Sequence, residues 1–145
     1  MTGEEIIVVE AGSPLLPEVF ALRTEVFVVE QGVPLELELD ELDQVATHLA
    51  ALHGAEVVGT LRLLQDHGAA KIGRVAVRAT LRRNGIGRRL MERSAALAAA
   101  RGFAEIVLHA QIAVARFYRG LGYVEEGDLF DEAGIPHITM RKKIV

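Results

Sequence analysis

The sequence predicts a single-domain α/β protein of the α+β kind, in which a mixed central β-sheet of roughly six to seven strands is flanked by about four helices. The chain has 145 residues, the length of one ordinary domain, so residues 1–145 are expected to form one unit. Half of its residues are hydrophobic, which is enough to fill a core. The segments follow the order βα, then three strands, then αβαββ, with no repeat or linker between them.

The N-terminal part predicts a strand, a helix and an acidic connection. Residues 6–9 (IIVV) are typical of a short strand. Ser13, Pro14 and Pro17 mark a helix start, because proline fits the first helical turn, where no N–H group is needed. The helix has one apolar stripe and ends at residues 32–34 (GVP). The acidic segment after it has no clean period, so we expect a loop or a short helix over the sheet.

The remaining elements follow from the same patterns. Residues 48–64 predict two strands that are separated by a tight turn at residues 53–55, and residues 71–77 predict another strand. An apolar face predicts a helix over residues 85–101, capped by Gly102. We expect a strand at 105–109, a short helix that stops at Gly120 or Gly122, and two strands at 122–126 and 137–142 with a polar turn between them.

Charges are segregated along the chain although the net charge is only −4. The stretch from Glu25 to Asp43 holds seven acidic residues and no Lys or Arg. The stretch from Lys71 to Arg101 holds nine basic residues and only one acidic residue, Glu92. One part of the domain therefore suits a cationic ligand and the other an anionic one, the alternative being solvated surface charge with no ligand.

Residues 78–87 join a predicted strand to a predicted helix and are rich in arginine and glycine. The first N–H groups of a helix have no partner, the helix dipole favours anions there, and glycines let phosphate oxygens approach the backbone. The alternative is that the glycines serve only the helix start and its packing. The Gly-Lys-Ser/Thr end of a Walker loop and the three glycines of a Rossmann fingerprint are absent, which disfavours nucleoside triphosphate and dinucleotide sites.

The motif Arg82-Arg83-Asn84-Gly85-Ile86-Gly87 resembles the pyrophosphate loop of the GNAT acyltransferases, whose form is Gln/Arg-x-x-Gly-x-Gly/Ala. Residues 73–77 are similar to the fourth strand of that family, and residues 117–123 to its late helix and strand. Residues 27–31, 40–43, 109–111 and 132–137 are similar to a bacterial GNAT branch whose members mostly lack assigned substrates. The resemblance covers nearly the whole chain, and it implies an N-acetyltransferase that uses acetyl-CoA as co-substrate.

The resemblance also implies which residues hold the co-substrate. Backbone groups of Val75 and Val77 are expected to bond the pantetheine arm, and N–H groups from Arg83 to Arg88 to hold the pyrophosphate. Many family members have Asn before the late helix, where Gln111 stands here, so we expect that contact to be longer or remodelled. The full expected set is Val75, Ala76, Val77, Arg82, Arg83, Asn84, Gly85, Ile86, Gly87, Arg88, Gln111 and Tyr118.

Tyr118 is the expected catalytic residue. An amine must lose a proton before it attacks a thioester, because a free lysine-type amine has a pKa of ~10, and the leaving thiolate is best protonated as it departs. Tyr118 lies ~100° around the helix from Phe117, so its ring can pack at the core while its hydroxyl reaches a cleft. A tyrosine at this position often protonates the sulfur in the family, and the alternative is a purely structural tyrosine.

The general base stays open, because no spacing selects one residue. A solvated carboxylate or a satisfied core histidine is the favoured interpretation for each candidate, and a chain of water molecules is a further alternative. The candidates are Glu30, Glu41, Asp43, Glu126, His48 and His109. The spacing of Asp40, Asp43 and His48 matches no metal site, so no metal is expected.

The acceptor is expected to be a small-molecule or peptide amine that is neutral or cationic, because the acidic stretch lies beside the acceptor end of the cleft in this fold. Its identity does not follow from the sequence, and neither does the oligomeric state, a homodimer included. The basic stretch has no aromatic stacking platform, so nucleic acid is not an expected partner.

The start of the chain lacks the basic and apolar regions of a signal peptide, and no apolar run approaches the ~20 residues of a membrane span. We therefore expect a cytoplasmic protein with no membrane partner. The chain has no cysteine, which excludes disulfides, thiolate metal sites and a cysteine nucleophile.

Two functions remain on this basis. The first is transfer of an acetyl group from acetyl-CoA to a primary amine by direct attack in a ternary complex. The alternative is a non-catalytic module that binds or senses acyl-CoA. Both bind CoA, but only the enzyme releases free CoA when an amine is added.

Overall fold

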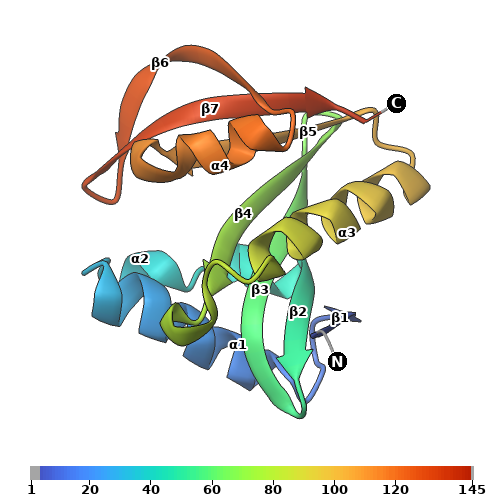
Figure 1. The fold of residues 1–145 in the computed structure, drawn as a ribbon, viewed down its shortest axis with the longest axis vertical. Coiled ribbons are helices and arrows are strands. Elements are labelled where there is room, and N and C mark those ends of the chain that lie inside the picture. Colours follow the sequence, from blue (N-terminus) through green and yellow to red (C-terminus); the bar gives the residue numbers. More distant parts are fainter. Residues whose placement is uncertain (1–3, 145) are drawn as a thin grey trace.

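The computed structural model describes residues 4–144, which form one seven-stranded sheet with the order β1-β2-β3-β4-β5-β7-β6 (Figure 1). Residues 1–3, part of the stretch in which we expect no signal peptide, lie outside the described residues, as does residue 145. β4 and β5 are parallel, and every other pair of neighbouring strands is antiparallel. The predicted mixed sheet is therefore confirmed.

The elements follow the predicted order. The strands are β1 (Glu5–Val9), β2 (Thr47–His53), β3 (Glu56–Asp66), β4 (Ala69–Val77), β5 (Glu105–Gln111), β6 (Val124–Glu132) and β7 (Ile135–Lys143). The α-helices are α1 (Leu16–Arg23), α2 (Leu35–Glu38), α3 (Ile86–Ala100) and α4 (Ala115–Gly120). α1 continues as a π-helical segment, Thr24–Glu30, and single turns of 3₁₀-helix lie at Glu41–Gln44, Ala79–Leu81 and Ile112–Val114. None of the helices between residues 4 and 144 has the length and apolar character that crossing a membrane requires.

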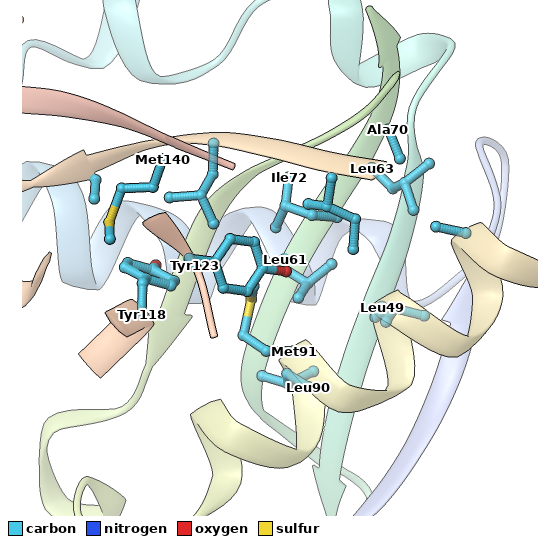
Figure 2. Close-up of a cluster of buried hydrophobic side chains, with 14 of the residues drawn as sticks. Leu49, Leu61, Leu63, Ala70, Ile72, Leu90, Met91, Tyr118, Tyr123 and Met140 are labelled. Carbon is cyan, nitrogen blue, oxygen red and sulfur yellow. The ribbon is translucent and has the colours of Figure 1, made fainter. Parts of the chain in front are cut away.

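Helices cover both faces of the sheet. On one face Leu90 and Met91 of α3 pack against Leu61 of β3 in a cluster that also takes in α4 (Figure 2). On the other face Val19 and its neighbours on α1 pack against Val57 in a smaller cluster. The sheet is thus the middle of three layers, as expected for a domain that buries both faces of its sheet.

α3 lies unusually close to β3 because β3 has a glycine at the contact. A Cβ atom added at Gly59 would lie 2.8 Å from Cγ2 of Ile86 and 3.0 Å from Cδ1 of Leu90, nearer than packed carbon atoms approach. Since Ile86 is the first residue of α3, this contact fixes the N-terminus of the helix against the sheet.

The predicted boundaries of the last two strands were wrong. β6 continues to Glu132 and β7 begins at Ile135, so the turn lies at Ala133-Gly134, where φ is 54° and 79°. Two left-handed residues in succession give the twist that a tight hairpin prefers. Gly127, which we expected in the turn, has φ 77° and lies at an irregularity in the β6–β7 pairing instead. A glycine in a polar stretch is typical of both a turn and a bulge, so the sequence pattern did not separate them.

β4 and β5 separate after a short paired segment. Only Ala70↔Ile106, Lys71↔Val107 and Ile72↔Leu108 are in register. Beyond them β4 follows β3 while β5 follows β7, and the two strands diverge in a V (Figure 1). The β3–β4 register shifts at this point, and Arg74 has φ 54°, so a bulge bends β4 away from β5.

Candidate active site

A cleft of about 1070 Å³ lies where β4 and β5 separate. Its walls come from β4, the β4–α3 loop, the start of α3, the end of β5, α4, residues 26–42 and the tip of the β6–β7 hairpin. Of the residues that we expected at the co-substrate, all but Asn84 line this cleft. Asn84 instead donates its side-chain amide to the carbonyl oxygens of Leu81 at 3.0 Å and Arg82 at 3.3 Å, which holds the loop in shape.

The N-terminus of α3 opens into the cleft with free hydrogen-bond donors. Gly85 precedes the helix with φ 81°, and no side chain caps it. The first bond across this helix start runs from the N–H of Arg89 to the carbonyl of Gly85 at 3.0 Å, so the earlier N–H groups of α3 have no partner within the helix. Neither Arg83 nor Arg88, which both line the cleft, has an ion-pair partner among residues 4–144. This end of the cleft suits an anion.

Gly87 leaves space for a ligand beside these donors. A Cβ atom added there would lie 3.4 Å from Cζ of Phe117 and 3.9 Å from Cγ2 of Val77, and both neighbours line the cleft. A side chain at this position would therefore project into the cleft between the helix and β4. The absence of one lets a phosphate reach the backbone.

Two of the expected residues are engaged with the protein itself. Arg82 donates to both carboxylate oxygens of Glu30, at 2.9 and 2.8 Å, and its Nε donates to the carbonyl of Val77 at 2.8 Å. The Gln111 amide donates to the side-chain oxygen of Gln31 at 2.9 Å. Glu30 and Gln31, at the end of the α1 helical segment, thus connect that segment to the β4–α3 loop and to the end of β5.

Tyr118 has its ring in the core and also lines the cleft. The ring centroid lies 5.0 Å from that of Phe117 and 6.1 Å from that of Tyr123, and only 7% of the residue is exposed. Figure 2 shows Tyr118 and Tyr123 in the core cluster. Burial raises the pKa of Tyr118 to about 12. The hydroxyl therefore carries its proton across the physiological pH range and can donate it.

Four of the candidate bases are carboxylates, and none is free at the cleft. Asp43 is buried in ion pairs with two arginines, and Glu30 is paired with Arg82. Glu126 accepts a hydrogen bond from Arg141 at 2.9 Å on the exposed side of β6, and neither it nor Glu41 lines the cleft.

The two candidate histidines differ in position. His48 is fully buried, contacts the ring of Phe20 and bonds the carbonyl of Asp43 through Nε2 at 3.1 Å. Burial lowers the pKa of His48, which makes it a neutral core residue. His109 lines the cleft, directly beyond the last pair of β4 and β5.

Glu132 and His137, which the site prediction did not include, join His109 at the cleft. Nδ1 of His109 lies 2.9 Å from Oε1 of Glu132, and Nε2 of His137 lies 3.7 Å from Oε2 of the same carboxylate. Phe130 packs on both imidazoles, with ring centroids 4.9 and 5.9 Å away. Residues 132–137 carried a signal, because they resemble the family branch. The contact itself depends on the pairing of β6 with β7, which the sequence did not predict.

The wall opposite β5 contains a cluster of paired charges. Arg23 and Glu38, each 1% exposed, form a salt bridge at 3.0 Å, and Arg23 also reaches Asp43 at 2.7 Å. Arg62 lies 2.7 Å from Asp40 and 2.9 Å from Asp43. Arg74, turned by the bulge, pairs with Glu38 at 2.7 Å and with Asp40 at 3.4 Å.

The ion pairs show that the acidic stretch from Glu25 to Asp43 is not an uncompensated negative region, as its sequence suggested. The acidic stretch contains no Lys or Arg of its own, but arginines on α1, β3 and β4 neutralise the three of its carboxylates that lie in the cluster. Those carboxylates therefore hold residues 38–43 against the sheet. They do not present a negative field to the cleft.

A family model for the acetyltransferase (GNAT) domain matches residues 5–144. The chain is 37% identical over 129 residues to the uncharacterized N-acetyltransferase YjcF of Bacillus subtilis, an alignment that covers 88% of this chain and 91% of YjcF. It is 31% identical over 129 residues to protein ElaA of Escherichia coli, covering 86% of this chain and 84% of ElaA.

Solved structures agree with these sequence matches. An acyl-CoA N-acyltransferase from Pseudomonas aeruginosa has a TM-score of 0.85 at 34% identity, covering 96% of this chain and 99% of that chain. The crystal structure of Escherichia coli ElaA has a TM-score of 0.86 at 27% identity, with the same coverage. The chain belongs to the GNAT acetyltransferase family, which confirms the resemblance inferred from the sequence.

We expect the ion-pair cluster to make stability depend on acid pH. Burial alone would raise the pKa of Asp43, but hydrogen bonds and charge from Arg23 and then Arg62 outweigh burial and lower the pKa to about 2. Since an unfolded aspartate has a pKa of ~3.9, this contribution is fully present above that pH and is lost as the pH falls through about 2. It amounts to about 2 kcal/mol.

The measurement is urea unfolding of the wild type and of Asp43→Asn between roughly pH 5 and pH 2. The variant should be less stable at the upper pH, because Arg23 and Arg62 lose a charged partner, but should lose about 2 kcal/mol less stability on acidification. Equal losses in the two proteins would show that Asp43 is not the group concerned.

Proposed function

We propose that the protein transfers an acetyl group from acetyl-CoA to a primary amine by direct attack in a ternary complex. One observation carries the proposal: the uncapped N-terminus of α3, with Gly87 beside it, opens into the same cleft as Tyr118. A phosphate-bearing carrier of a thioester needs a site for its phosphates and a proton for its leaving sulfur. The anion-binding end of the cleft and Tyr118 supply these two requirements.

The residues present fit CoA. The first N–H groups of α3 supply donors for a pyrophosphate, and Arg83 and Arg88 supply unpaired positive charge. The divergence of β4 from β5 leaves the facing backbone groups of both strands without strand partners beyond Ile72 and Leu108. The amide-rich pantetheine arm can satisfy such groups, and CoA then supplies an activated thioester carbonyl at the inner end of the cleft.

Tyr118 is proposed to protonate the sulfur as the carbon–sulfur bond breaks. The hydroxyl is protonated at physiological pH, as that of any tyrosine with a pKa of ~10 or above, and the ring of Tyr118 packs between neighbouring aromatic side chains. A donor held in place costs little reorganisation when the reaction occurs.

The acceptor is proposed to be a neutral or cationic amine of small-molecule or peptide type. The support is now Glu132, a carboxylate in the cleft that has no arginine partner among the described residues. The acidic stretch no longer supports this preference, because its cleft-side carboxylates are paired with arginines.

The test is release of free CoA from acetyl-CoA in the presence of a panel of amines, amino acids, polyamines and peptides. The protein has no cysteine, so a thiol reagent reports only the product. Binding of acetyl-CoA without thiol release for any acceptor would favour the non-catalytic module. Acidic acceptors as the best substrates would contradict the proposed acceptor charge.

Gly87→Ala should weaken acetyl-CoA binding without harming the fold. The added methyl group would meet Phe117 at an ordinary contact distance, and alanine is the better helix former by about 1 kcal/mol, so the melting temperature should stay the same or rise. Losing one charge-assisted hydrogen bond, about 1.5–3 kcal/mol, raises the dissociation constant by roughly 10-fold or more.

Calorimetric titration with acetyl-CoA and with pantetheine, which has no pyrophosphate, measures the effect. Gly120→Ala is the matched control, since it is a glycine of α4 with open space around its Cβ position and does not line the cleft. If Gly87→Ala binds acetyl-CoA as the wild type does, or loses as much affinity for pantetheine, then the phosphate does not bind beside Gly87.

Tyr118→Phe should lower turnover by roughly 10²-fold, the usual size for loss of one general acid, while the acetyl-CoA affinity stays nearly constant. The loss should be smaller for an acyl donor whose leaving thiol has a lower pKa, because a better leaving group needs less protonation. Steady-state kinetics with the two donors measure both effects.

Tyr123→Phe is the control for the loss of a hydroxyl. Tyr123 packs beside Tyr118, but its hydroxyl is buried without a partner among the described residues, and the residue does not line the cleft. Its removal should leave turnover unchanged and stability equal or higher. Full turnover by Tyr118→Phe, when chemistry limits the rate, would leave solvent as the proton donor.

A further inference from the structure

We propose that His109 is the general base for the acceptor amine and that Glu132 is the positioning residue that holds it in the reactive tautomer. The inference rests on the proposed acyl transfer and adds the group that the transfer still lacks. Two observations carry it: the geometry of the His109–Glu132 pair and its place at the point where β4 and β5 separate.

The hydrogen bond fixes which nitrogen of His109 has a lone pair. Nδ1 lies 2.9 Å from Oε1 of Glu132. An ionised carboxylate can only accept, so Nδ1 carries the proton in the neutral imidazole, and Nε2 is left without one. A nitrogen in this state is a proton acceptor.

Glu132 stays ionised, which this arrangement requires. The hydrogen bond from His109 lowers the pKa of Glu132, and burial opposes the lowering. Positive charge on Lys71, and on the two histidines when they are protonated, lowers this pKa further. His137 donates Nδ1–H to the carbonyl of Ile135 at 2.7 Å, so it does not compete for the lone pairs of Glu132 through that nitrogen.

The surrounding charges come from three strands. The titratable neighbours of His109 are Glu132 of β6, its hydrogen-bond partner, and Lys71 of β4 and His137 of β7, which act on Glu132. Arg62, Arg74 and Asp40 line the same cleft but are bound to one another and to Glu38 and Asp43. Phe130 covers the ring of His109 edge-on at 4.9 Å between centroids.

His109 and Tyr118 approach the cleft from opposite faces of the sheet. Side chains alternate along a strand, and Leu108 and Ala110 belong to the core cluster that contains α3 and Tyr118. His109, between them, therefore points to the other face. A thioester lying in the gap between β4 and β5 would have the proton donor for its sulfur on one side and a proton acceptor for the incoming amine on the other.

His109 and Tyr118 together account for every proton that moves in the reaction. Nε2 of His109 accepts a proton from the ammonium form of the acceptor, and the freed lone pair forms the C–N bond at the thioester carbonyl carbon. The C–S bond breaks and the sulfur takes the hydroxyl proton of Tyr118. The second proton of the amine nitrogen returns to Tyr118, and His109 releases its proton to solvent. One amine and one thioester thus give an amide, a thiol and, from an ammonium ion, one proton.

The kinetic test compares His109→Gln and Glu132→Gln with His53→Gln, an exposed histidine of β2 outside the cleft. His109→Gln should lower kcat/KM by roughly 10²-fold and Glu132→Gln by on the order of 10-fold, with acetyl-CoA affinity unchanged in both. The acidic limb of the kcat/KM–pH profile, which reports the base, should disappear in His109→Gln. Added imidazole should restore part of the activity of His109→Ala, and His53→Gln should behave as the wild type.

A second readout needs neither substrate nor turnover. Long-range ¹H–¹⁵N correlation spectra of the imidazole rings, recorded at alkaline pH, should show His109 protonated on Nδ1, with the signal assigned by its loss in His109→Gln. Glu132→Ala, which removes the acceptor, should release this tautomer preference. Protonation on Nε2 in the wild type would overturn the proposal, and so would a preference that survives Glu132→Ala.

Different results would overturn the role of His109 as base and the acyl transfer itself. An active wild type with an equally active His109→Gln would overturn the base alone. Equal losses of acetyl-CoA affinity and turnover in His109→Gln would also overturn it, because the residue would then serve binding. If the wild type binds acetyl-CoA but none of the amines tested leads to release of free CoA, the acyl transfer and the base are overturned together.

Discussion

The separation of β4 from β5 is the constraint on which the rest of the structure depends. Three residue pairs hold the two halves of the sheet together, and beyond them each strand keeps a partner on only one side. Backbone groups on the open sides need hydrogen bonds from elsewhere, since an unpaired buried N–H or C=O group is costly. The bulge at Arg74 produces the bend, and the same residue then uses its guanidinium to bind Glu38 and Asp40. The opening and the wall that faces it are thus consequences of one local distortion of β4.

The buried ion pairs explain how a polar segment can form that wall. Residues 38–43 are tied to α1, β3 and β4 through ion pairs, and Glu38 and Asp40 line the cleft. Arg23 from α1 donates several hydrogen bonds to Glu38 and Asp43. Arg62 from β3 donates to Asp40 and Asp43, although its buried Nε has no partner among the described residues. These bonds offset much of the cost of removing the charges from water. Removing one partner would leave an uncompensated buried charge, which costs about 3–5 kcal/mol. The cluster therefore specifies the position of this segment more than it adds net stability.

Most of the fold could be predicted from the sequence, because hydrophobic periodicity and glycine positions are local signals. The strand–loop–helix unit around Gly85 and Gly87 was predicted with nearly the right boundaries, and so was the place of Tyr118 between core and cleft. The partners of charged side chains could not be predicted in this way. Glu38 is 15 residues from Arg23, and Asp40 is 22 residues from Arg62, so these pairs appear only when the sheet is assembled. The contact of His109 with Glu132 spans 23 residues. It depends on strand pairing up to a turn at Ala133-Gly134, whereas the sequence predicted a longer turn over the whole stretch between residues 126 and 137.

Once the ion-paired side chains are excluded, the charges left in the cleft are positive at the α3 end and include a carboxylate at the other end. At the α3 end, Arg83 and Arg88 have no ion-pair partner within residues 4–144 and lie beside the free N–H groups, so this end is positive. At the other end, Glu132 lines the cleft without an arginine partner in the part of the chain that the structure describes, and Lys71 lies near enough to affect its pKa. A carboxylate with one ammonium group beside it exerts little attraction at long range, because the two fields largely cancel and salt screens the remainder. Glu132 therefore acts over contact distance, on His109 and on a group bound beside it in the cleft, and does not attract cations from far away.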